Sequence, residues 1–367
     1  MDARMEALLR LSLTRGLGRV GLRRLMEAFG SPDEVLLARP RELVERAGLR
    51  AAAAGGLLPA GDARVGKLCQ AMEAMGARLL SLWDEDYPPL LRQIPDAPPL
   101  LYLRGRLPDA PLVAIVGSRD ASREGLGLAF DIARKLAEAG VGTVSGLARG
   151  VDGAAHEGTL AGGGQTVAVL GCGPDRVYPP EHARLFRDIL SKGAVLAEVP
   201  PGSEPLASNF PGRNRIISGL AGAVLIVEAK EGSGSLITAD FALEQGREVL
   251  AVPGAVRFSG SQGPNRLIRE GATLVTCARD VLEALGMDGR VARPVCAPVS
   301  PPASRVPEGL CESARKLCEL LGPDPLHMDE IARKTGLTPM DLSDSLLDLE
   351  LAGAIVQLPG ARYVLKK

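Results

Sequence analysis

Between residues 111 and 270 the sequence alternates short, almost wholly apolar runs with longer segments of helical periodicity. The apolar runs are LVAIVG from residue 112, TVSG from 143, TVAVLG from 166, AVLAEV from 194, AVLIVE from 223 and EVLAVPG from 248. Helical patterns begin near residues 123, 152, 182, 211, 236 and 266. Apolar strands separated by helices are typical of a parallel sheet that is buried on both faces. We therefore predict a doubly wound α/β domain over residues 83–286.

The first 82 residues predict a separate domain of short helices joined by Gly-rich turns. The run GLGRVGLRRLMEAFGSPDEVL from Gly16 places glycines before an amphipathic helix, as in a helix-hairpin-helix or sterile-alpha-motif (SAM)-like bundle. Its glycines favour either phosphate contact at a helix N-terminus or simple helix packing, and both interpretations stay open. The Pro-rich segment YPPLLRQIPDAPPLLYLRGRLP from Tyr87 is interpreted as the entry linker to the α/β domain.

The C-terminal part predicts a flexible linker and a third domain. Residues 287–307 combine Pro, Ala and Ser without periodicity, which is typical of a linker. Residues 308–367 show helical patterns from Glu312, Met328 and Pro339, then two β-like runs around a Pro-Gly turn, which predict a winged helix. The last helical pattern carries Asp341, Asp344, Asp348 and Glu350 without Lys or Arg. Phosphates would repel such a helix, so a transcription regulator that reads duplex DNA is disfavoured.

Composition excludes several classes of protein. The formal net charge is −1, so any polyanion site must be a local cluster of basic groups. No apolar run approaches the roughly 20 residues of a membrane span, and the start MDARMEALLR lacks the pattern of a signal peptide. We expect a cytoplasmic protein that does not associate with membranes. Six scattered cysteines and three histidines form no zinc-ligand spacing, so no metal site is expected.

Small and basic residues follow the predicted strands, at the edge where doubly wound sheets bind ligands. They are Gly117-Ser118-Arg119, the loop with Gly146 and Arg149, the segment Phe210 to Arg215, and the loop Gly232 to Ser235. Glycines allow close backbone approach, arginines clamp phosphates, and four such turns on one edge favour a polymer of phosphates. Phe210 can either stack on a base or pack in the core.

Motifs for cofactors and catalysis are missing. The order G-x-G-x-x-G does not follow the first strand, and Lys230 lies near the Gly-Ser loop without the P-loop order, so no nucleotide cofactor is expected. Asp152 and His156 share a helix face four residues apart, but without a second histidine nearby we favour a structural hydrogen bond over a metal or acid–base pair. We predict no catalytic residue and a protein that is not an enzyme.

In their order and spacing the motifs closely resemble the DNA-processing protein A (DprA/Smf) family. The resembling runs are GSR at 117–119, SGLARGVDGAAHEGTL from Ser145, FPGRNRIISGL from Phe210, GSGSLITADFALEQGREV from Gly232 and QGPNRLIREGA from Gln262. The resemblance implies an extended Rossmann-like fold that binds single-stranded DNA without sequence preference. It further implies a homodimer that protects incoming DNA and helps load RecA recombinase during natural transformation.

The resemblance assigns DNA contacts to Arg119 and to the segment from Phe210 to Arg215. Some family members carry a lysine shortly before the phenylalanine, where this chain has Ala207 and Ser208, so affinity here should depend more on Arg213 and Arg215. The full predicted set of DNA or phosphate contacts is Gly117, Ser118, Arg119, Gly146, Arg149, Phe210, Arg213, Asn214, Arg215, Gly232, Ser233, Gly234 and Ser235.

The alternative function is a nucleotide-processing enzyme of the phosphoribohydrolase-like Rossmann type. Such enzymes also use Gly-rich strand ends, and Asp152, Glu157 or Glu228 would be the candidate catalytic acid here. Their P-G-G-x-G-T run is missing from this chain, which disfavours the alternative.

Overall fold

The computed structural model describes residues 3–287, 317, 320–321, 326–351, 354–358 and 362–365. The chain divides into two compact units, Met1–Ala292 and Arg293–Lys367. The predicted linker at 287–307 lies outside the described residues except for Met287, and the start of the helical pattern from Glu312 lies outside them as well.

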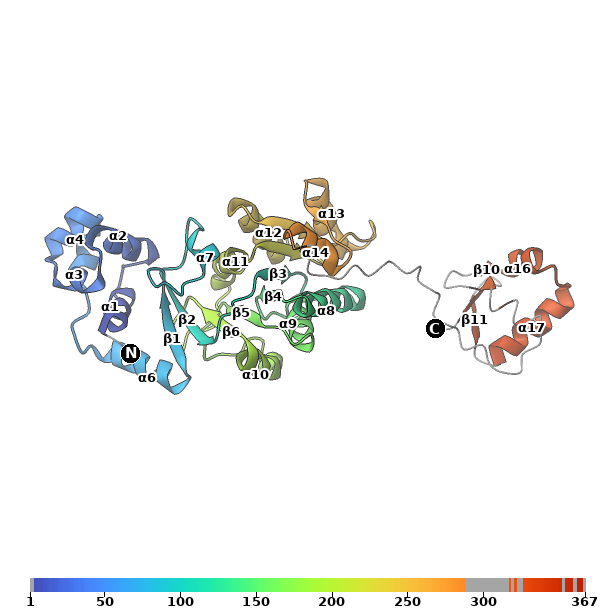
Figure 1. The fold of residues 1–367 in the computed structure, drawn as a ribbon, viewed down its shortest axis with the longest axis horizontal. Helices are drawn as coiled ribbons and strands as arrows, with labels where there is room; N and C mark the ends of the chain where they lie inside the picture. Colours follow the sequence, from blue (N-terminus) through green and yellow to red (C-terminus); the bar gives the residue numbers. More distant parts are fainter. Residues whose placement is uncertain are drawn as a thin grey trace. The chain divides into compact units, whose positions relative to one another are not determined.

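The first unit is built on a nine-stranded sheet with the order β1-β2-β6-β5-β4-β3-β7-β8-β9 (Figure 1). The strands are β1 (Ala77–Ser81), β2 (Leu100–Gly105), β3 (Leu112–Val116), β4 (Gly142–Ser145), β5 (Thr166–Leu170), β6 (Ala194–Ala197), β7 (Ala223–Ile226), β8 (Glu248–Ala251) and β9 (Thr273–Leu274). All neighbours from β6 to β9 pair in parallel, whereas β2 pairs antiparallel with both β1 and β6. The predicted doubly wound α/β fold is confirmed.

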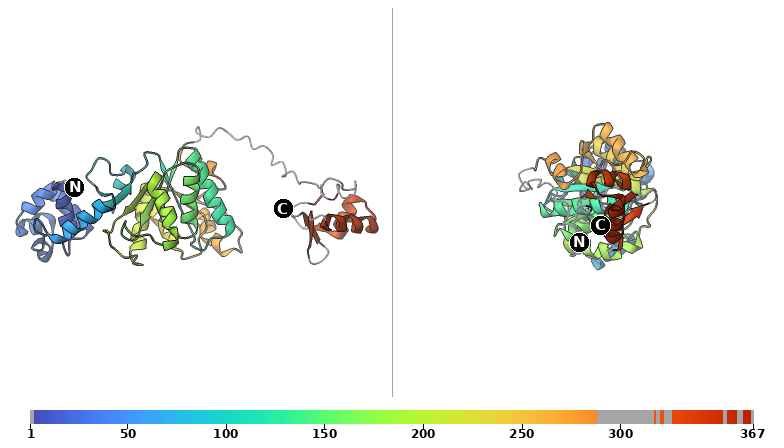
Figure 2. Two further views of the ribbon diagram at one scale, coloured as in Figure 1. Left: turned by 90° about the horizontal axis from the view of Figure 1, so that it is seen from below. Right: turned by 90° about the vertical axis from the view of Figure 1, so that its right-hand side faces the viewer.

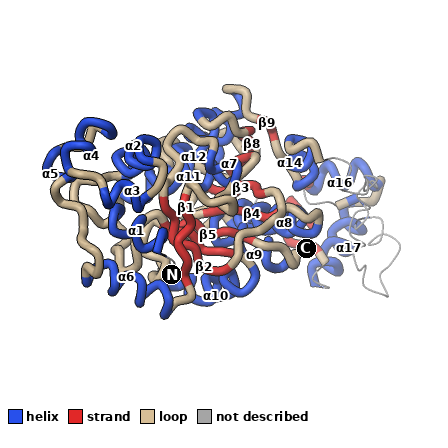
Figure 3. Tube along the Cα trace, turned by 60° about the vertical axis from the view of Figure 1, so that its left-hand side comes forward, coloured by secondary structure: helices blue, strands red, loops and turns tan. Residues whose placement is uncertain are grey.

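Helices cover both faces of the sheet because its strands are apolar on both sides (Figures 2 and 3). In β3, Val113 and Ile115 pack on one face, while Leu112, Ala114 and Val116 pack on the other. The first face carries α8 (Arg123–Glu138), α9 (Val151–Ala161), α10 (Ala183–Lys192) and α14 (Ala278–Ala284). The second carries α7 (Pro89–Arg92), α11 (Asn209–Leu220), α12 (Gly234–Glu244) and α13 (Gln262–Arg269). The fold also includes the short 3₁₀ helices η1 (Pro180–His182) and η2 (Ser259–Ser261).

The interpretation of the Pro-rich segment from Tyr87 as a linker is wrong. This segment contains α7 and strand β2, and Tyr102 of β2 pairs with Ala197 of β6. The prolines flank β2 rather than interrupt it, so its LLYLRG run keeps its backbone donors for the sheet. Strand β1 precedes residue 83, where the domain boundary was predicted, and pairs with β2. Residues 77–81 thus contribute to the sheet.

Helices dominate the N-terminal part, as predicted. They are α1 (Ala3–Ser12), α2 (Arg19–Phe29), α3 (Pro32–Leu37), α4 (Pro40–Ala47), α5 (Ala51–Ala54) and α6 (Ala63–Ala74). Their apolar faces enclose a core that includes Leu8, Leu25 and Leu43, and this core continues onto Leu79 of β1 and Tyr102 of β2. The helical layer is therefore anchored on the antiparallel end of the sheet.

The second unit combines helices with a small antiparallel sheet. Its described elements are β10 (Leu326–His327), α16 (Met328–Thr335), α17 (Pro339–Leu351), β11 (Ile355–Leu358) and β12 (Arg362–Leu365), with the strand order β10-β12-β11. Ile331, Leu342, Leu346 and Leu349 form its core. Helices α16 and α17 and strands β11 and β12 follow the order that the sequence predicted for a winged helix, whereas β10 was not predicted. Over the part of the chain that the structure describes, no helix is both long and apolar enough to cross a membrane.

Candidate nucleic-acid interface

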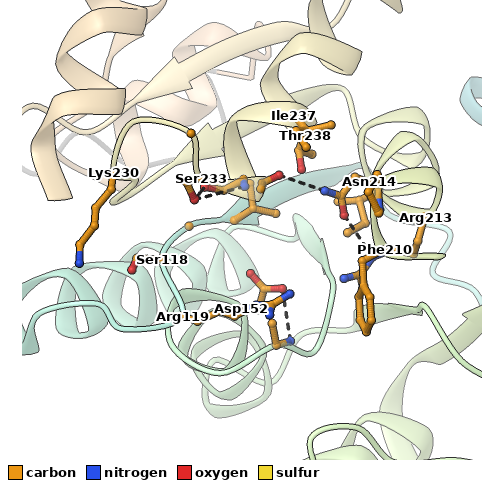
Figure 4. Close-up of a pocket in the computed structure, with 18 of the residues that line it drawn as sticks. Ser118, Arg119, Asp152, Phe210, Arg213, Asn214, Lys230, Ser233, Ile237 and Thr238 are labelled. Atoms are coloured by element: carbon orange, nitrogen blue, oxygen red, sulfur yellow. Dashed lines mark hydrogen bonds between the residues drawn. The ribbon is translucent and has the colours of Figure 1, made fainter. Parts of the chain in front are cut away.

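A cavity of about 630 Å³ lies at the carboxyl ends of β3 and β7 (Figure 4). From β3 the chain adds β4, β5 and β6 on one side of the sheet and then β7, β8 and β9 on the other, so the strand order reverses at this point. Three segments line most of the cavity: the β3–α8 loop at 117–120, the start of α11 with the residues before it, and the loop at 230–235 that leads into α12. Ligands of doubly wound sheets bind at this switch point. The cavity therefore collects most of the predicted contact residues in the position that the fold favours.

Close backbone packing fixes the β3–α8 loop. A Cβ on Gly117 would lie 2.6 Å from Val151 Cγ2 and 2.9 Å from the Glu228 carbonyl oxygen, so only glycine fits there. The Ser118 N–H donates to the same carbonyl oxygen at 2.6 Å. Gly150 approaches the loop from α9 with φ of 76°. The loop leaves the Arg119 side chain exposed at the cavity.

Phe210 lies at the centre of a cluster of aromatic and cationic groups. The guanidinium carbons of Arg119 and Arg213 each lie 5.7 Å from the centroid of its ring. The ring of Tyr178 is 5.9 Å away, centroid to centroid, at an interplanar angle of 50°. Phe210 is half-buried and Tyr178 is 42% exposed, and both line the cavity. The sequence left core packing open for Phe210, and the structure instead places its ring in the wall of the cavity.

Arg213 is a buried cation that holds two strand ends together. Its Nη1 donates to the carbonyl oxygen of Gly146 at 2.7 Å and also to that of Val169. Burial lowers the pKa of Arg213 to about 10, and the attraction of Asp152 opposes that shift, so the guanidinium stays charged at neutral pH. The Asp152 carboxylate accepts from the N–H groups of Gly146 and Ala148 at 3.0 and 3.3 Å. Burial raises its pKa.

The β7–α12 loop contributes hydroxyl groups and a lysine. The Ser233 hydroxyl caps α12 by accepting from the Ser235 N–H at 3.4 Å, and the two hydroxyl oxygens are 2.8 Å apart. Asn214 of α11 donates through Nδ2 to the Gly234 carbonyl oxygen at 3.1 Å, which ties α11 to this loop. Lys230 lies exposed at the rim of the cavity and makes no ion pair among the described residues.

Three predicted contacts do not line the cavity. Arg215 is 1% exposed and pairs through Nε with Asp96 at 2.7 Å and through Nη2 with Glu198 at 2.6 Å. Arg149 is exposed and pairs with Glu181. Gly146 contributes its backbone to the buried network below the cavity. The other ten predicted residues, Gly117, Ser118, Arg119, Phe210, Arg213, Asn214, Gly232, Ser233, Gly234 and Ser235, all line it. Arg215 therefore does not reach the cavity: its Nε and Nη2 meet carboxylates, and its buried Nη1 has no hydrogen-bond partner among the described residues.

Sequence reasoning missed Tyr178 and Lys230, both of which line the cavity. Lys230 was considered only as part of a P-loop, although its place four residues after the end of β7, next to the Gly-Ser loop, was the usable signal. Tyr178 lies eight residues beyond the end of β5, and only the path of the intervening loop brings it to Phe210.

Buried acids and histidine near the site serve the framework. His156 Nδ1 lies 2.7 Å from the Thr166 hydroxyl rather than on Asp152, and burial lowers its pKa to about 3. Glu228 accepts from the N–H of Ser122 at 2.9 Å and from its hydroxyl at 2.5 Å. Asp152 and Glu228 were candidate catalytic acids for a nucleotide-processing enzyme, and the carboxylates of both accept hydrogen bonds from backbone N–H groups. Among the described residues no cluster of three or more His, Cys, Asp or Glu could hold a metal ion.

Comparison with known proteins places these features in a family. The model of DNA recombination-mediator protein A matches residues 78–286, and the model of the DprA winged helix domain matches residues 301–361. Protein Smf of Synechocystis sp. is 33% identical over 383 residues, which cover 96% of this chain and 96% of that protein. DNA processing protein DprA of Streptococcus pneumoniae is 47% identical over 204 residues, which cover 55% of this chain and 72% of that protein.

Two solved structures are similar in sequence and fold. The X-ray structure of DNA processing protein A from Streptococcus pneumoniae has a TM-score of 0.70 at 37% identity and covers 77% of this chain and 98% of that one. A structure of DNA processing protein A from Helicobacter pylori, which concerns its single-stranded DNA binding mode, has a TM-score of 0.53 at 29% identity and covers 58% of this chain and 96% of that one.

Proposed function

The chain belongs to the DNA recombination-mediator protein A (DprA/Smf) family, and from this premise we propose that it binds single-stranded DNA in the cavity at the switch point of its sheet. Its role is then the processing of DNA for recombination during transformation. DNA processing protein A of Helicobacter pylori has a single-stranded DNA binding mode, which supports the proposal for this chain.

The observation that carries the proposal is the setting of Phe210. A half-buried aromatic ring with the guanidinium carbon of exposed Arg119 at 5.7 Å offers a stacking surface for one base next to charge for its phosphate. Stacking suits any base, and the cavity wall offers backbone and hydroxyl groups rather than a fixed set of base-reading side chains. We therefore propose binding without sequence preference.

The charges divide into those that support the site and those that are free to meet a ligand. Arg213 and Arg215 are buried and hold protein groups, whereas Arg119 and Lys230 are exposed at the cavity without an ion pair among the described residues. This chain has Ala207 and Ser208 in the stretch where some family members carry a lysine. We propose that Lys230 and Arg119, rather than Arg213 and Arg215, supply the phosphate contacts here.

Fluorescence anisotropy of a labelled oligo-dT in a salt titration tests this assignment. Arg119→Ala with Lys230→Ala should weaken binding and reduce the slope of log K against log salt by about 1 to 2, because roughly 0.7 counterions are released per phosphate of a single strand. Arg149→Ala is the matched control, since Arg149 is also exposed but pairs with Glu181 outside the cavity. An unchanged slope in the double variant would contradict the assignment.

Phe210→Ala tests the stacking surface in the same assay. Loss of one stacked base, worth about 1–3 kcal/mol, should weaken binding roughly 5- to 150-fold without changing the salt slope. Phe210→Tyr keeps the ring and should restore most of the affinity. Equal affinity for the alanine and wild-type proteins would refute the stacking role.

RecA loading and homodimer formation belong to the same proposal but rest on the family alone. Stimulated assembly of RecA on single-stranded DNA and the mass of the free protein in solution are their direct measurements. The cytoplasmic location and the absence of catalysis stay predictions.

A further inference from the structure

A second basic region lies in the N-terminal helices, away from the residues that line the cavity. Residues 7–26 contain five arginines and no acid, and residues 46–61 contain two arginines and no acid. Each stretch contains a turn between helices that begins at an exposed glycine: Gly16-Leu17-Gly18 precedes α2, and Gly48-Leu49-Arg50 precedes α5. The chain thus repeats one arrangement, an acid-free turn with exposed glycines beside arginines.

The two turns pack against each other. A Cβ on Gly21 of α2 would lie 2.7 Å from Leu17 Cδ1 and 3.4 Å from Leu49 Cδ2, so these three residues meet. A Cβ on Gly16 would lie 3.7 Å from the Cβ of Ala53. The two leucines are buried and the turn glycines are exposed. The apolar side of both turns therefore faces the core, and their backbones face solvent together.

Four arginines surround these turns with their charges free. The side chains of Arg15, Arg19, Arg24 and Arg50 are all exposed, and none of these side chains has a hydrogen-bond or ion-pair partner within the described ranges. Arg24 Nη1 lies 3.8 Å from the position of a Cβ on Gly48, which links the arginines of the two stretches. We call Arg15, Arg19, Arg24 and Arg50 the hairpin surface.

Neighbouring arginines outside this set serve the fold instead. Arg10 donates to the Leu58 carbonyl oxygen at 2.8 Å, Arg23 to that of Pro95 at 2.7 Å, and Arg46 to that of Ala28 at 2.5 Å. The structure thus uses part of the basic content to hold helices together and leaves the hairpin surface available.

We propose that the hairpin surface binds the sugar–phosphate backbone of duplex DNA, as a site separate from the single-strand cavity. Exposed glycine backbones allow phosphates to approach closely, and four unpaired guanidinium groups supply the charge. Residues 3–76 contain one aromatic side chain, Phe29, which is 5% exposed, so this surface has no ring on which unpaired bases could stack. Contacts to the backbone alone suit a duplex, whose bases are already stacked inside.

The test compares a blunt 20-base-pair duplex with oligo-dT, using the full chain and anisotropy in a salt titration. Arg15→Gln, Arg19→Gln, Arg24→Gln and Arg50→Gln combined should weaken duplex binding by about tenfold or more and lower its salt slope by about 2 to 4, at roughly 0.9 per phosphate contact. Glutamine keeps the helix propensity and most of the stem of arginine. Oligo-dT binding should stay unchanged.

A matched control removes equal charge from the same helices. Arg19→Gln with Arg50→Gln is compared with Arg41→Gln and Lys67→Gln, which are also exposed and without partners among the described residues but lie outside the two turns. The first pair should weaken duplex binding and the second should not. Equal losses from both pairs, or no duplex binding by the wild-type protein, would overturn the proposal.

Two further binding experiments distinguish the hairpin surface from the cavity and from a membrane-binding surface. Arg119→Ala with Lys230→Ala should weaken oligo-dT binding and leave duplex binding intact, so failure of the cavity and failure of the hairpin surface give different results. Binding to phosphatidylserine vesicles that depends on the hairpin surface, without binding to the duplex, would overturn the assignment in favour of a membrane. Urea unfolding of each variant verifies that the fold is retained.

Discussion

Replacing Arg213 with alanine should destabilise the first unit more than it removes a contact with DNA. The guanidinium is buried, donates to the carbonyl oxygens of Gly146 and Val169, and offsets the negative charge of buried Asp152. Its loss leaves two carbonyl groups without this donor and removes the cation whose attraction opposes the raised pKa of Asp152. Removal of one partner from a buried charge pair costs about 3–5 kcal/mol.

The expected loss of stability is large enough to measure in two ways. At roughly 2–4 °C per kcal/mol for a unit of this size, the melting temperature should fall by about 6–20 °C. Urea unfolding followed by circular dichroism gives the change in free energy directly. Arg119→Ala is the control, because Arg119 is exposed and lies near the same ring, so its loss should weaken DNA binding at unchanged stability.

The reasoning fails if Arg213→Ala is as stable as the wild-type protein and still loses DNA binding. That result would make Arg213 a ligand contact and would mean that Asp152 needs no counter-charge. If both stability and binding fall, Arg213→Lys should restore part of the stability, because it returns the charge but only part of the hydrogen bonding.

Two further changes probe the framework of the cavity. Burial lowers the pKa of His156 to about 3, so as the pH falls below about 6.5 the unfolded chain binds a proton at His156 and the folded chain does not. The free energy of unfolding should therefore fall by about 2 kcal/mol between pH 8 and pH 5 because of this group. His156→Gln should remove that part of the pH dependence of the urea midpoint, and identical pH profiles for both proteins would refute it. Gly150→Ala should destabilise the first unit and weaken oligo-dT binding, because a Cβ there would collide with the Ser118 carbonyl oxygen. Gly163→Ala is the matched control with the same φ of 76° and open space around it, so it should cost only about 1–2 kcal/mol of backbone strain; equal effects of the two substitutions would argue against the collision.

The parallel part of the fold could be predicted because burial on both faces leaves a plain signal in the sequence. The run LVAIV has no polar side chain, and the structure buries every one of its residues. The antiparallel strands β1 and β2 were missed because their flanking prolines and turns resemble a linker, while the pairing of β2 with β6 depends on residues some 90 positions away. Local patterns carry no information about such a partner.

The candidate site was predicted at the level of loops rather than of side chains. Arg213 and Arg215 are two residues apart on α11, so their side chains point about 200° apart around the helix and could not both face one cavity. That geometry was available from the sequence and would have separated the two. What the sequence could not supply was which one faces Phe210, since Asp96 and Glu198, the partners of Arg215, are distant in the chain.

The division between buried and exposed cations determines how the protein would respond to salt. With a net charge of −1 the chain has no general attraction for a polyanion, so affinity must come from short-range contacts at clusters. Buried Arg213 and Arg215 are screened little by salt because solvent does not reach them, and the site should keep its shape in concentrated salt. The charges of exposed Arg119 and Lys230 are fully screened by salt ions. Binding should therefore fall steeply with salt while urea stability barely changes, and parallel losses of both would show that the framework itself depends on surface charge.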